Sequence, residues 1–298
     1  MLGKAWAVLK IHGTRGLVRS VQAKIAQPGI PIKLTTKSCL VSLGYEDRWV
    51  ANGESTRHSV SVIILSREQR LLDGCLASVF RSVVPAAKLE LFVVSNGRGL
   101  QLSQAYPFPL RLVRENRPFN WSAYNNLAAK MAGGGFLLFL NDDVEALHGG
   151  WLDAMLDEAR RPGVGAVGAK LLYPVGLIQH CGIKVGGAGV EASHLYKFQP
   201  RNWLGEEGEL LLPRQVDAVT GACLLTPRDL FCEMGGFDEG LALSYNDVDY
   251  CLRLRQAGYA VVVTPRAELI HRETSTRPWK VRPREKTLFR KKWAHVMY

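Results

Sequence analysis

Near its middle the chain reads Phe136-Leu-Leu-Phe-Leu-Asn-Asp-Asp143, an apolar run that ends on one amide and two carboxylates. Such a continuous run is typical of a strand that is buried on both faces of a sheet. Adjacent carboxylates at the end of that strand repel each other unless a positive charge lies nearby, and Mg²⁺ or Mn²⁺ is the simplest such charge. A solvated turn that caps the next helix is the alternative.

Short runs rich in β-branched residues recur on both sides of this stretch. They are Val60–Leu65, Leu91–Val94, Val164–Val167, Val216–Leu225 and Ala260–Thr264. An apolar face with helical period lies between the first two runs, and Ser66 and Gln69 have the spacing of a capping box at its start. Strand–helix–strand order predicts an α/β fold with a mainly parallel central sheet flanked by helices. Ligands bind such sheets at the carboxyl ends of the strands.

Two later helices carry clear boundary signals. Thr226-Pro227 is expected to begin one, with proline at the first helical position, and Gly235-Gly236 to end it. Asn246 is expected to cap another that stops at Gly258.

This second helix would place Asp247 at its first position and Asp249 at its third. The helix dipole there favours an ionised carboxylate, so Asp247 is a candidate proton acceptor, while Asp249 is assigned to capping. His271 follows the last apolar strand and is either a structural histidine or a third metal ligand.

The net charge of +11 is concentrated at the two ends: residues 1–58 carry +6, residues 272–298 carry +7, and the part between carries −2. Nucleic-acid binding is disfavoured, because such proteins place positive charge along the substrate path. Basic ends with apolar residues suit an anionic membrane surface, with solubilising or packed tails as the alternative. The apolar residues concerned are Trp6, Leu9, Trp279, Phe289 and Trp293.

The six cysteines are scattered and form no CxxC pair. This usage predicts buried free thiols in a reducing compartment and hence a cytoplasmic protein. The sequence also contains no apolar run long enough to span a bilayer and no secretory signal at its start.

At these residues the sequence resembles glycosyltransferase family 2, which has the GT-A fold, and is most similar to the branch that builds bacterial surface polysaccharides and includes rhamnosyltransferases. The matching pieces, in family order, are Val60-Ser-Val-Ile-Ile-Leu-Ser66, Val93-Val-Ser-Asn-Gly97, Phe119-Asn-Trp-Ser-Ala-Tyr-Asn-Asn126, Phe139-Leu-Asn-Asp-Asp143, Val219-Thr-Gly-Ala222, Gly235-Gly-Phe-Asp-Glu239, Asn246-Asp-Val-Asp-Tyr-Cys-Leu-Arg253 and His271. The resemblance implies a catalytic domain over residues 58–276. The charge distribution and the amphipathic pattern predict a basic, helical extension over residues 1–57 and a basic tail over residues 277–298.

The resemblance also implies roles for individual residues. Asp247 would be the catalytic base, and Asp143, Asp142 and His271 would hold Mg²⁺ or Mn²⁺. The nucleotide-sugar donor would be bound by Ser66, Ser95, Asn96, Asn120, Asn125, Asn141 and Asp142. The loop near the acceptor would consist of Gly235, Gly236 and Phe237.

The function implied is inverting transfer of a hexosyl or deoxyhexosyl group from a nucleotide diphosphate donor to the hydroxyl of a saccharide or lipid-linked saccharide. The enzyme would serve cell-envelope polysaccharide or glycolipid synthesis, peripherally on the inner face of the plasma membrane. The family usually has Asp where this chain has Ser95, so a weakly active or non-catalytic nucleotide-sugar-binding subunit is the alternative. A sugar-phosphate nucleotidylyltransferase would need a glycine-rich basic signature after the first strand, and Leu65-Ser-Arg-Glu-Gln-Arg70 is not one.

Overall fold

The computed structural model describes residues 60–83, 89–96, 99–102, 108–186, 191–273 and 281–297. Contacts divide the chain into residues 1–51 and 52–298, and every described residue belongs to the second unit. The predictions for residues 1–57, including Trp6 and Leu9, and the one for Trp279 therefore lie outside the described residues.

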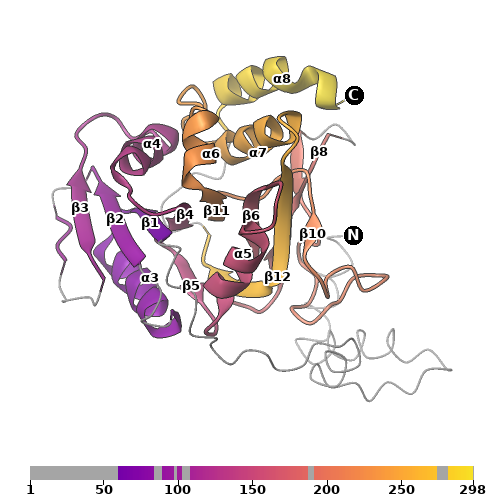
Figure 1. The fold of residues 1–298 in the computed structure, drawn as a ribbon, viewed down its shortest axis with the longest axis horizontal. Helices are drawn as coiled ribbons and strands as arrows, with labels where there is room; N and C mark the ends of the chain where they lie inside the picture. Colours follow the sequence, from indigo (N-terminus) through magenta and orange to yellow (C-terminus); the bar gives the residue numbers. More distant parts are fainter. Residues whose placement is uncertain are drawn as a thin grey trace, which may run out of the picture. The chain divides into compact units, whose positions relative to one another are not determined.

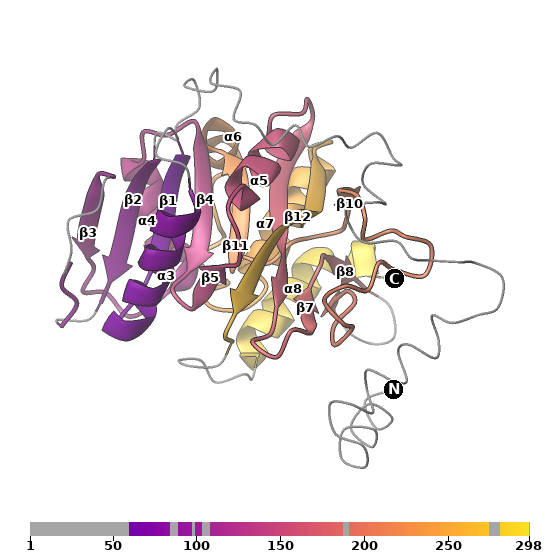
Figure 2. The ribbon, with the colours of Figure 1, turned by 90° about the horizontal axis from the view of Figure 1, so that it is seen from below.

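The second unit is built on a ten-stranded sheet, whose main path has the order β10-β12-β6-β11-β4-β1-β2-β3 (Figure 2). Its strands are β1 (Val60–Leu65), β2 (Leu89–Ser95), β3 (Leu110–Arg114), β4 (Phe136–Asn141), β5 (Val144–Ala146), β6 (Val164–Leu172), β7 (Ile178–His180), β10 (Arg214–Gln215), β11 (Cys223–Pro227) and β12 (Ala260–His271). A separate pair is formed by β8 (Ile183–Val185) and β9 (Ala192–His194).

The sheet has a parallel half and a mixed half. β4, β1, β2 and β3 are neighbours and all run parallel. β11 is antiparallel to both of its neighbours, β4 and β6, and β12 is parallel to β6. The fold is thus α/β with a central sheet flanked by helices, as predicted, although the parallel pairing is broken at β11.

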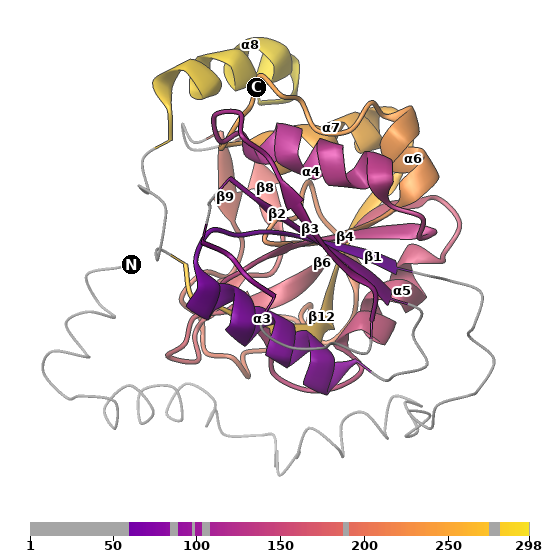
Figure 3. The same ribbon diagram turned by 90° about the vertical axis from the view of Figure 1, so that its left-hand side faces the viewer.

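Helices cover both faces of the sheet (Figures 1 and 3). One face carries α3 (Gln69–Ser82) and α5 (Trp151–Ala159), and the other carries α4 (Trp121–Met131), α6 (Arg228–Glu233) and α7 (Asn246–Gln256).

Alternate strand residues belong to two separate hydrophobic cores. Ile63 and Phe139 pack with α4, α6 and α7, whereas Ile64 and Leu138 pack with α3 and α5. β1 and β4 read as continuous apolar runs because both of their faces are buried.

The last helix, α8 (Pro283–Met297), lies beside α7 on the outer side of that layer (Figures 1 and 3). Phe289 is 0% exposed and Trp293 is 2% exposed. The prediction that these two side chains face an anionic membrane surface is therefore wrong. They pack into the hydrophobic core of their own domain, which is the alternative of a packed tail.

Several predicted element boundaries are also wrong. The helix α3 begins at Gln69 with Glu68 at the cap position, and Ser66 does not form the predicted capping box because its hydroxyl donates to Asp142. Pro227 lies at the cap of α6 rather than at its first helical position. The run Val216–Leu225 forms a strand only from Cys223 onwards.

The helix α7 begins one residue earlier than the sequence suggests. Tyr245 is the cap residue, in the left-handed conformation with φ 62°, and Asn246 is the first helical residue. Asp247 and Asp249 therefore occupy the second and fourth positions of the helix.

Four of the cysteines are buried free thiols, as predicted: Cys75, Cys181, Cys223 and Cys251. Cys232 is also a free thiol, but it is exposed, so the prediction of burial is wrong for this residue. Cys39 lies outside the described residues.

Within the described ranges, no helix is long and apolar enough to cross a membrane.

Candidate active site

The carboxyl ends of four strands bring most of the predicted site residues to one edge of the sheet. β1, β2 and β4 run parallel, so Ser66, Ser95 and Asn141 emerge at the same edge. β4 and β6 run in the same direction because each is antiparallel to β11, and β12 is parallel to β6. β12 therefore has the same direction as β4. His271, the last residue of β12, therefore reaches that edge as well.

The turn after β4 separates its two carboxylates. Asp142 Oδ2 accepts a hydrogen bond of 2.6 Å from Ser66 Oγ, at the end of the neighbouring strand. Burial, with a further contribution from the charge of Asp143, raises the pKa of Asp142 from 3.8 to about 6, and the Ser66 hydrogen bond opposes this rise. Asp142 is thus a partly buried carboxylate that binds Ser66.

Asp143 turns the other way, toward His271. Its Oδ1 lies 3.2 Å from His271 Nε2, and its carbonyl accepts a backbone hydrogen bond of 3.0 Å from Arg272. The pairing of β5 with β12 keeps the two residues together, because Val144, which follows Asp143, pairs directly with His271. The amide nitrogen of Asn141 also lies 3.4 Å from His271 Nε2.

Gln179 determines which ring nitrogen of His271 carries the proton. Gln179 Nε2 donates to the His271 carbonyl at 3.3 Å and to Glu273 Oε2 at 3.0 Å, which orients its Oε1 toward His271 Nδ1 at 2.7 Å. Since Oε1 can only accept, Nδ1 of His271 is the donor in a neutral ring, and Nε2 presents a lone pair to Asp143. With the ring neutral, two acceptors face each other across 3.2 Å.

A divalent cation fits this pair. An imidazole lone pair and a carboxylate are both metal ligands, and a histidine ligand commonly donates its other N–H to an oriented acceptor, as His271 does to Gln179. No group of three or more His, Cys, Asp or Glu side chains in the described part of the chain is arranged to hold a metal ion, and Asp142 is engaged with Ser66. Mg²⁺ and Mn²⁺ sites with few protein ligands are completed by substrate phosphate and water.

Asp247 is fixed by backbone donors at the same edge. Its Oδ2 accepts from Gly221 N at 2.8 Å and its Oδ1 from Val248 N at 2.8 Å. Gly221 precedes β11 and lies beside the end of β4, because Ala222 O accepts from Asn141 N at 3.0 Å. A Cβ at residue 221 would lie 2.7 Å from the Trp121 ring, so only glycine fits there.

Asp249 has a different environment although it lies only two residues further along. It is 0% exposed and binds Arg253 Nε at 2.9 Å, Trp293 Nε1 at 2.9 Å and Lys292 Nζ at 2.7 Å. This carboxylate is structural, through an ion-pair network rather than through the predicted helix capping.

The remaining predicted donor-binding residues have contacts within the protein. Ser95 is buried, and Asn96 is exposed next to it. Asn120 caps α4 through Ala123 N at 3.0 Å, and Asn125 is buried with its amide on the Trp121 carbonyl at 2.9 Å. Donor binding by these residues stays a prediction.

The predicted acceptor loop needs one correction. Gly235 and Gly236 both adopt positive φ values, 75° and 73°, which allows a sharp turn after α6. The ring of Phe237, however, is 2% exposed and lies 4.7 Å from Phe139 and 4.8 Å from Trp121 between centroids. Phe237 therefore belongs to the hydrophobic core and does not offer its ring to an acceptor.

Sequence reasoning missed Gln179 and Glu273. Gln179 lies in a strand of three residues, which is too short to give a periodic signal. The contact of Gln179 with His271 forms only because β7 and the end of β12 both pair with the last residues of β6.

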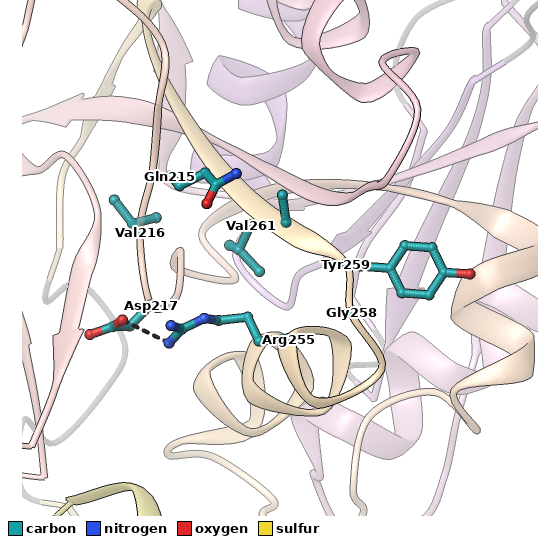
Figure 4. A pocket seen from close by; sticks show the side chains of 8 residues that line it. Gln215, Val216, Asp217, Arg255, Gly258, Tyr259 and Val261 are labelled. Carbon is teal, nitrogen blue, oxygen red and sulfur yellow. Dashed lines mark hydrogen bonds and ion pairs between the residues drawn. The ribbon is translucent and has the colours of Figure 1, made fainter.

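An open cavity of about 270 Å³ lies elsewhere, between β10 and the start of β12 (Figure 4). Asp217 and Arg255 form an ion pair of 2.7 Å at its wall. Ala260 and Val261 open β12 there, whereas His271 ends it, so this cavity is at the opposite edge of the sheet from the candidate site.

Comparison with protein families agrees with this arrangement. The family model "Glycosyl transferase family 2" matches residues 59–180, from β1 to the end of β7. The chain thus carries a glycosyl transferase family 2 domain.

Three relatives share substantial identity with the chain. "Uncharacterized protein y4gI" of Sinorhizobium fredii is 37% identical over 87% of this chain and 30% of its own length. "O-antigen biosynthesis protein RfbC" of Myxococcus xanthus is 34% identical over 89% of this chain and 21% of its own length. "N-acetylglucosaminyl-diphospho-decaprenol L-rhamnosyltransferase" of Mycobacterium tuberculosis is 36% identical over 46% of each chain. The chain therefore spans less than half the length of each of these relatives.

Solved structures show the same fold. GalNAc-T7 with UDP, GalNAc and Mn²⁺ matches 72% of this chain and 44% of its own, with a TM-score of 0.56 and 16% identity. The mannosyltransferase PcManGT from Pyrobaculum calidifontis, with GDP-Man and Mn²⁺, matches 80% of this chain and 70% of its own, with a TM-score of 0.52 and 14% identity. The α/β fold is therefore that of GT-A glycosyltransferases.

Replacing Asp142 by Asn should stabilise the protein at neutral pH in the absence of divalent cations. Its folded pKa, about 6, exceeds the ordinary value of 3.8, so the folded state binds this proton more tightly than the unfolded chain does. Ionisation of Asp142 therefore lowers the free energy of unfolding. This loss of stability is absent below pH 3.8 and complete above about pH 6. At about 1.4 kcal/mol per pKa unit, Asp142→Asn should raise the free energy of unfolding by roughly 3 kcal/mol at pH 8 and by little at pH 4.

Urea unfolding at the two pH values measures this difference. Asp229→Asn, which neutralises a carboxylate with 91% of its side chain exposed, is the matched control and should give no comparable difference. An Asp142→Asn protein that is less stable than wild type at pH 8 would contradict the assignment of a destabilising charge to Asp142.

Proposed function

We propose that this domain catalyses inverting transfer of a sugar from a nucleotide diphosphate donor to an acceptor hydroxyl. The proposal is based on one observation: the Asp247 carboxylate and the Asp143–His271 pair form two separate sites at the same edge of the sheet. Asp247 is held by two backbone N–H groups, and Asp143 lies 3.2 Å from Nε2 of His271, which is an acceptor when the ring is neutral. A base for the acceptor and a cation site for the diphosphate are the two functions that such a transfer needs.

Asp247 would act as the general base. Its carboxylate is fixed at both oxygens, and each oxygen retains a second lone pair that can accept the proton of an acceptor hydroxyl. Proton removal as the hydroxyl oxygen attacks the anomeric carbon, with departure of the nucleotide diphosphate from the opposite face, inverts that carbon in one step. Asp249 does not compete for this function, since Arg253, Lys292 and Trp293 occupy it.

Asp143 and His271 would hold Mg²⁺ or Mn²⁺, with Gln179 orienting the histidine. Such an ion, when bound, supplies neutralising charge for the leaving diphosphate. Ser66 keeps Asp142 away from this pair, which leaves Asp142 available to the donor at the end of β4.

The relatives suggest the class of substrate. One is named for rhamnosyl transfer to N-acetylglucosaminyl-diphospho-decaprenol and another for O-antigen biosynthesis. We therefore propose a hexosyl or deoxyhexosyl donor and a saccharide or lipid-linked saccharide acceptor in cell-envelope synthesis at the cytoplasmic face of the membrane. Residues 58–276 would form the catalytic domain in this scheme.

The first prediction for this function concerns the metal ion. With a panel of nucleotide sugars and saccharide acceptors, mass spectrometry should detect a glycosylated product only when Mg²⁺ or Mn²⁺ is present. Gln179→Leu removes the group that orients His271, so the apparent metal affinity should fall by about 10-fold or more. Full activity after exhaustive chelation, or donor-dependent thermal stabilisation without any turnover, would contradict the proposal, and the latter would favour a non-catalytic binding subunit.

The second prediction identifies the base. Asp247→Asn should lower the transfer rate by about 100-fold or more, the usual scale for a general base. One of the two backbone N–H groups then faces an amide instead of an oxygen, so the free energy of unfolding should fall by only about 1 kcal/mol. Donor affinity, measured by calorimetry, should change little. A variant that keeps wild-type turnover would show that another group accepts the proton.

The third prediction concerns the membrane. Because α8 uses Phe289 and Trp293 within the domain, we propose that any attachment to anionic lipid rests on residues 1–57 and on exposed cations of α8 such as Arg284 and Lys291. Each cation near such a surface contributes about 1 kcal/mol, and salt screens the attraction. Co-sedimentation with anionic vesicles should therefore weaken as salt rises and be lost when residues 1–57 are deleted and Arg284 and Lys291 are both replaced by Ala. Absence of binding at low salt would reject the membrane interpretation.

A further inference from the structure

The residue that precedes α7 has an unusual backbone. Tyr245 adopts φ 62° and ψ 3°, in the left-handed region, which costs a residue with a side chain roughly 1–2 kcal/mol. Its carbonyl accepts from Asp249 N at 2.8 Å, so the direction in which α7 starts depends on this conformation. Asp247 lies in the turn that this hydrogen bond closes.

The helix α8 holds the side chain of Tyr245. The rings of Tyr245 and Phe289 stack with centroids 4.5 Å apart and planes 16° apart, and Phe289 is fully buried. The hydroxyl of Tyr245 lies 3.4 Å from Glu191 Oε2, and Glu191 in turn forms ion pairs with Lys286 and Arg290 of α8.

Two further contacts attach α8 to the backbone before Tyr245 and to the helix after Asp247. Glu285 Oε2 accepts from Leu243 N at 3.2 Å and from Ser244 N at 2.6 Å, and Glu285 is buried. On the other side, Trp293 Nε1 donates to Asp249 Oδ1 at 2.9 Å. The chain is thus held by α8 on both sides of Asp247, and Asp247 itself contacts Gly221 and Val248 instead.

We infer that α8 is a brace that keeps Tyr245 in its left-handed conformation and thereby positions the Asp247 carboxylate for proton transfer. Glu285, Phe289 and Trp293 are positioning residues in this scheme, since none of them needs to contact a substrate. The inference rests on the proposed role of Asp247, and it extends that role to a helix outside the segment matched by the family model.

The physical reason for an effect on rate is geometric. A misplacement of about 1 Å at a reacting group can lower a rate by about 100-fold. Without the Phe289 ring the left-handed cost at Tyr245 is no longer opposed by stacking, so the first turn of α7 is free to relax.

Phe289→Leu in the full chain tests the brace. The variant keeps an apolar side chain and removes the ring stack, so kcat should fall about 10-fold or more while KM for the donor stays within about twofold. Hydrogen exchange should accelerate at the Asp249 amide, which bonds to the Tyr245 carbonyl, and less so in β1 and β2. Glu285→Gln, which keeps a carbonyl oxygen for Leu243 and Ser244, should retain more activity than Glu285→Ala.

Three control variants separate positioning from stability. Thr287→Ala changes an exposed residue of α8 and should leave kcat and exchange unchanged. Val79→Ala removes buried volume under α3, in the other hydrophobic core, and should lower the melting temperature without a comparable loss of kcat. Tyr245→Phe keeps the ring stack and should remain close to wild type.

Two outcomes would overturn the brace. One is an unchanged rate of hydrogen exchange at the Asp249 amide of Phe289→Leu. The other is a loss of kcat in Phe289→Leu that is no greater than the loss in Val79→Ala, when the two variants have the same melting temperature. Failure of the proposed function gives a different pattern. The wild-type chain would then turn over no donor, while faster exchange in Phe289→Leu would still support the brace.

Discussion

The rest of the structure depends on the pairing of β4 with both of its neighbours. β4 joins the parallel half of the sheet, through β1, to the mixed half, through β11. Its alternate residues also enter both hydrophobic cores, so the strand is buried along its whole length. Polar residues can begin only where this burial ends, and that position is Asn141. The site therefore lies at the edge of the sheet because the interior on either face has no room for an unpaired charge.

Asp247 and Asp249 show how one helix turn can present two carboxylates for different purposes. Asp249 points into the protein and is neutralised by Arg253 and Lys292, which a fully buried carboxylate requires. Among the described residues, backbone N–H groups of Gly221 and Val248 bind the Asp247 carboxylate and fix its geometry, and no ion pair of this carboxylate is seen there. The first arrangement stabilises the contact between α7 and α8, and the second leaves a charge that can react.

The sequence predicted the strands that are buried on both faces, because Val60–Leu65 and Phe136–Leu140 are long apolar runs with few alternative conformations. It also indicated that residues after β1, β2, β4 and β12 would gather, since parallel strands end at a common edge. It could not predict the short strands β5, β7 and β10, whose two or three residues carry no periodicity. The shift of α7 by one residue and the burial of Phe289 and Trp293 depend on contacts between distant segments, which local patterns do not contain.

The register of β4 has a consequence for how the family domain can change in length. Leu65 pairs with Asn141 and Cys223 pairs with Leu140, so each residue of β4 has a fixed place relative to both neighbours. Inserting one residue into this strand would exchange its two faces, moving Phe139 and Leu138 into the wrong cores and turning Asp143 away from His271. Insertions and deletions should therefore accumulate in loops with exposed residues, such as residues 204–207, and homologous chains should keep the number of residues between the start of β4 and its acidic turn.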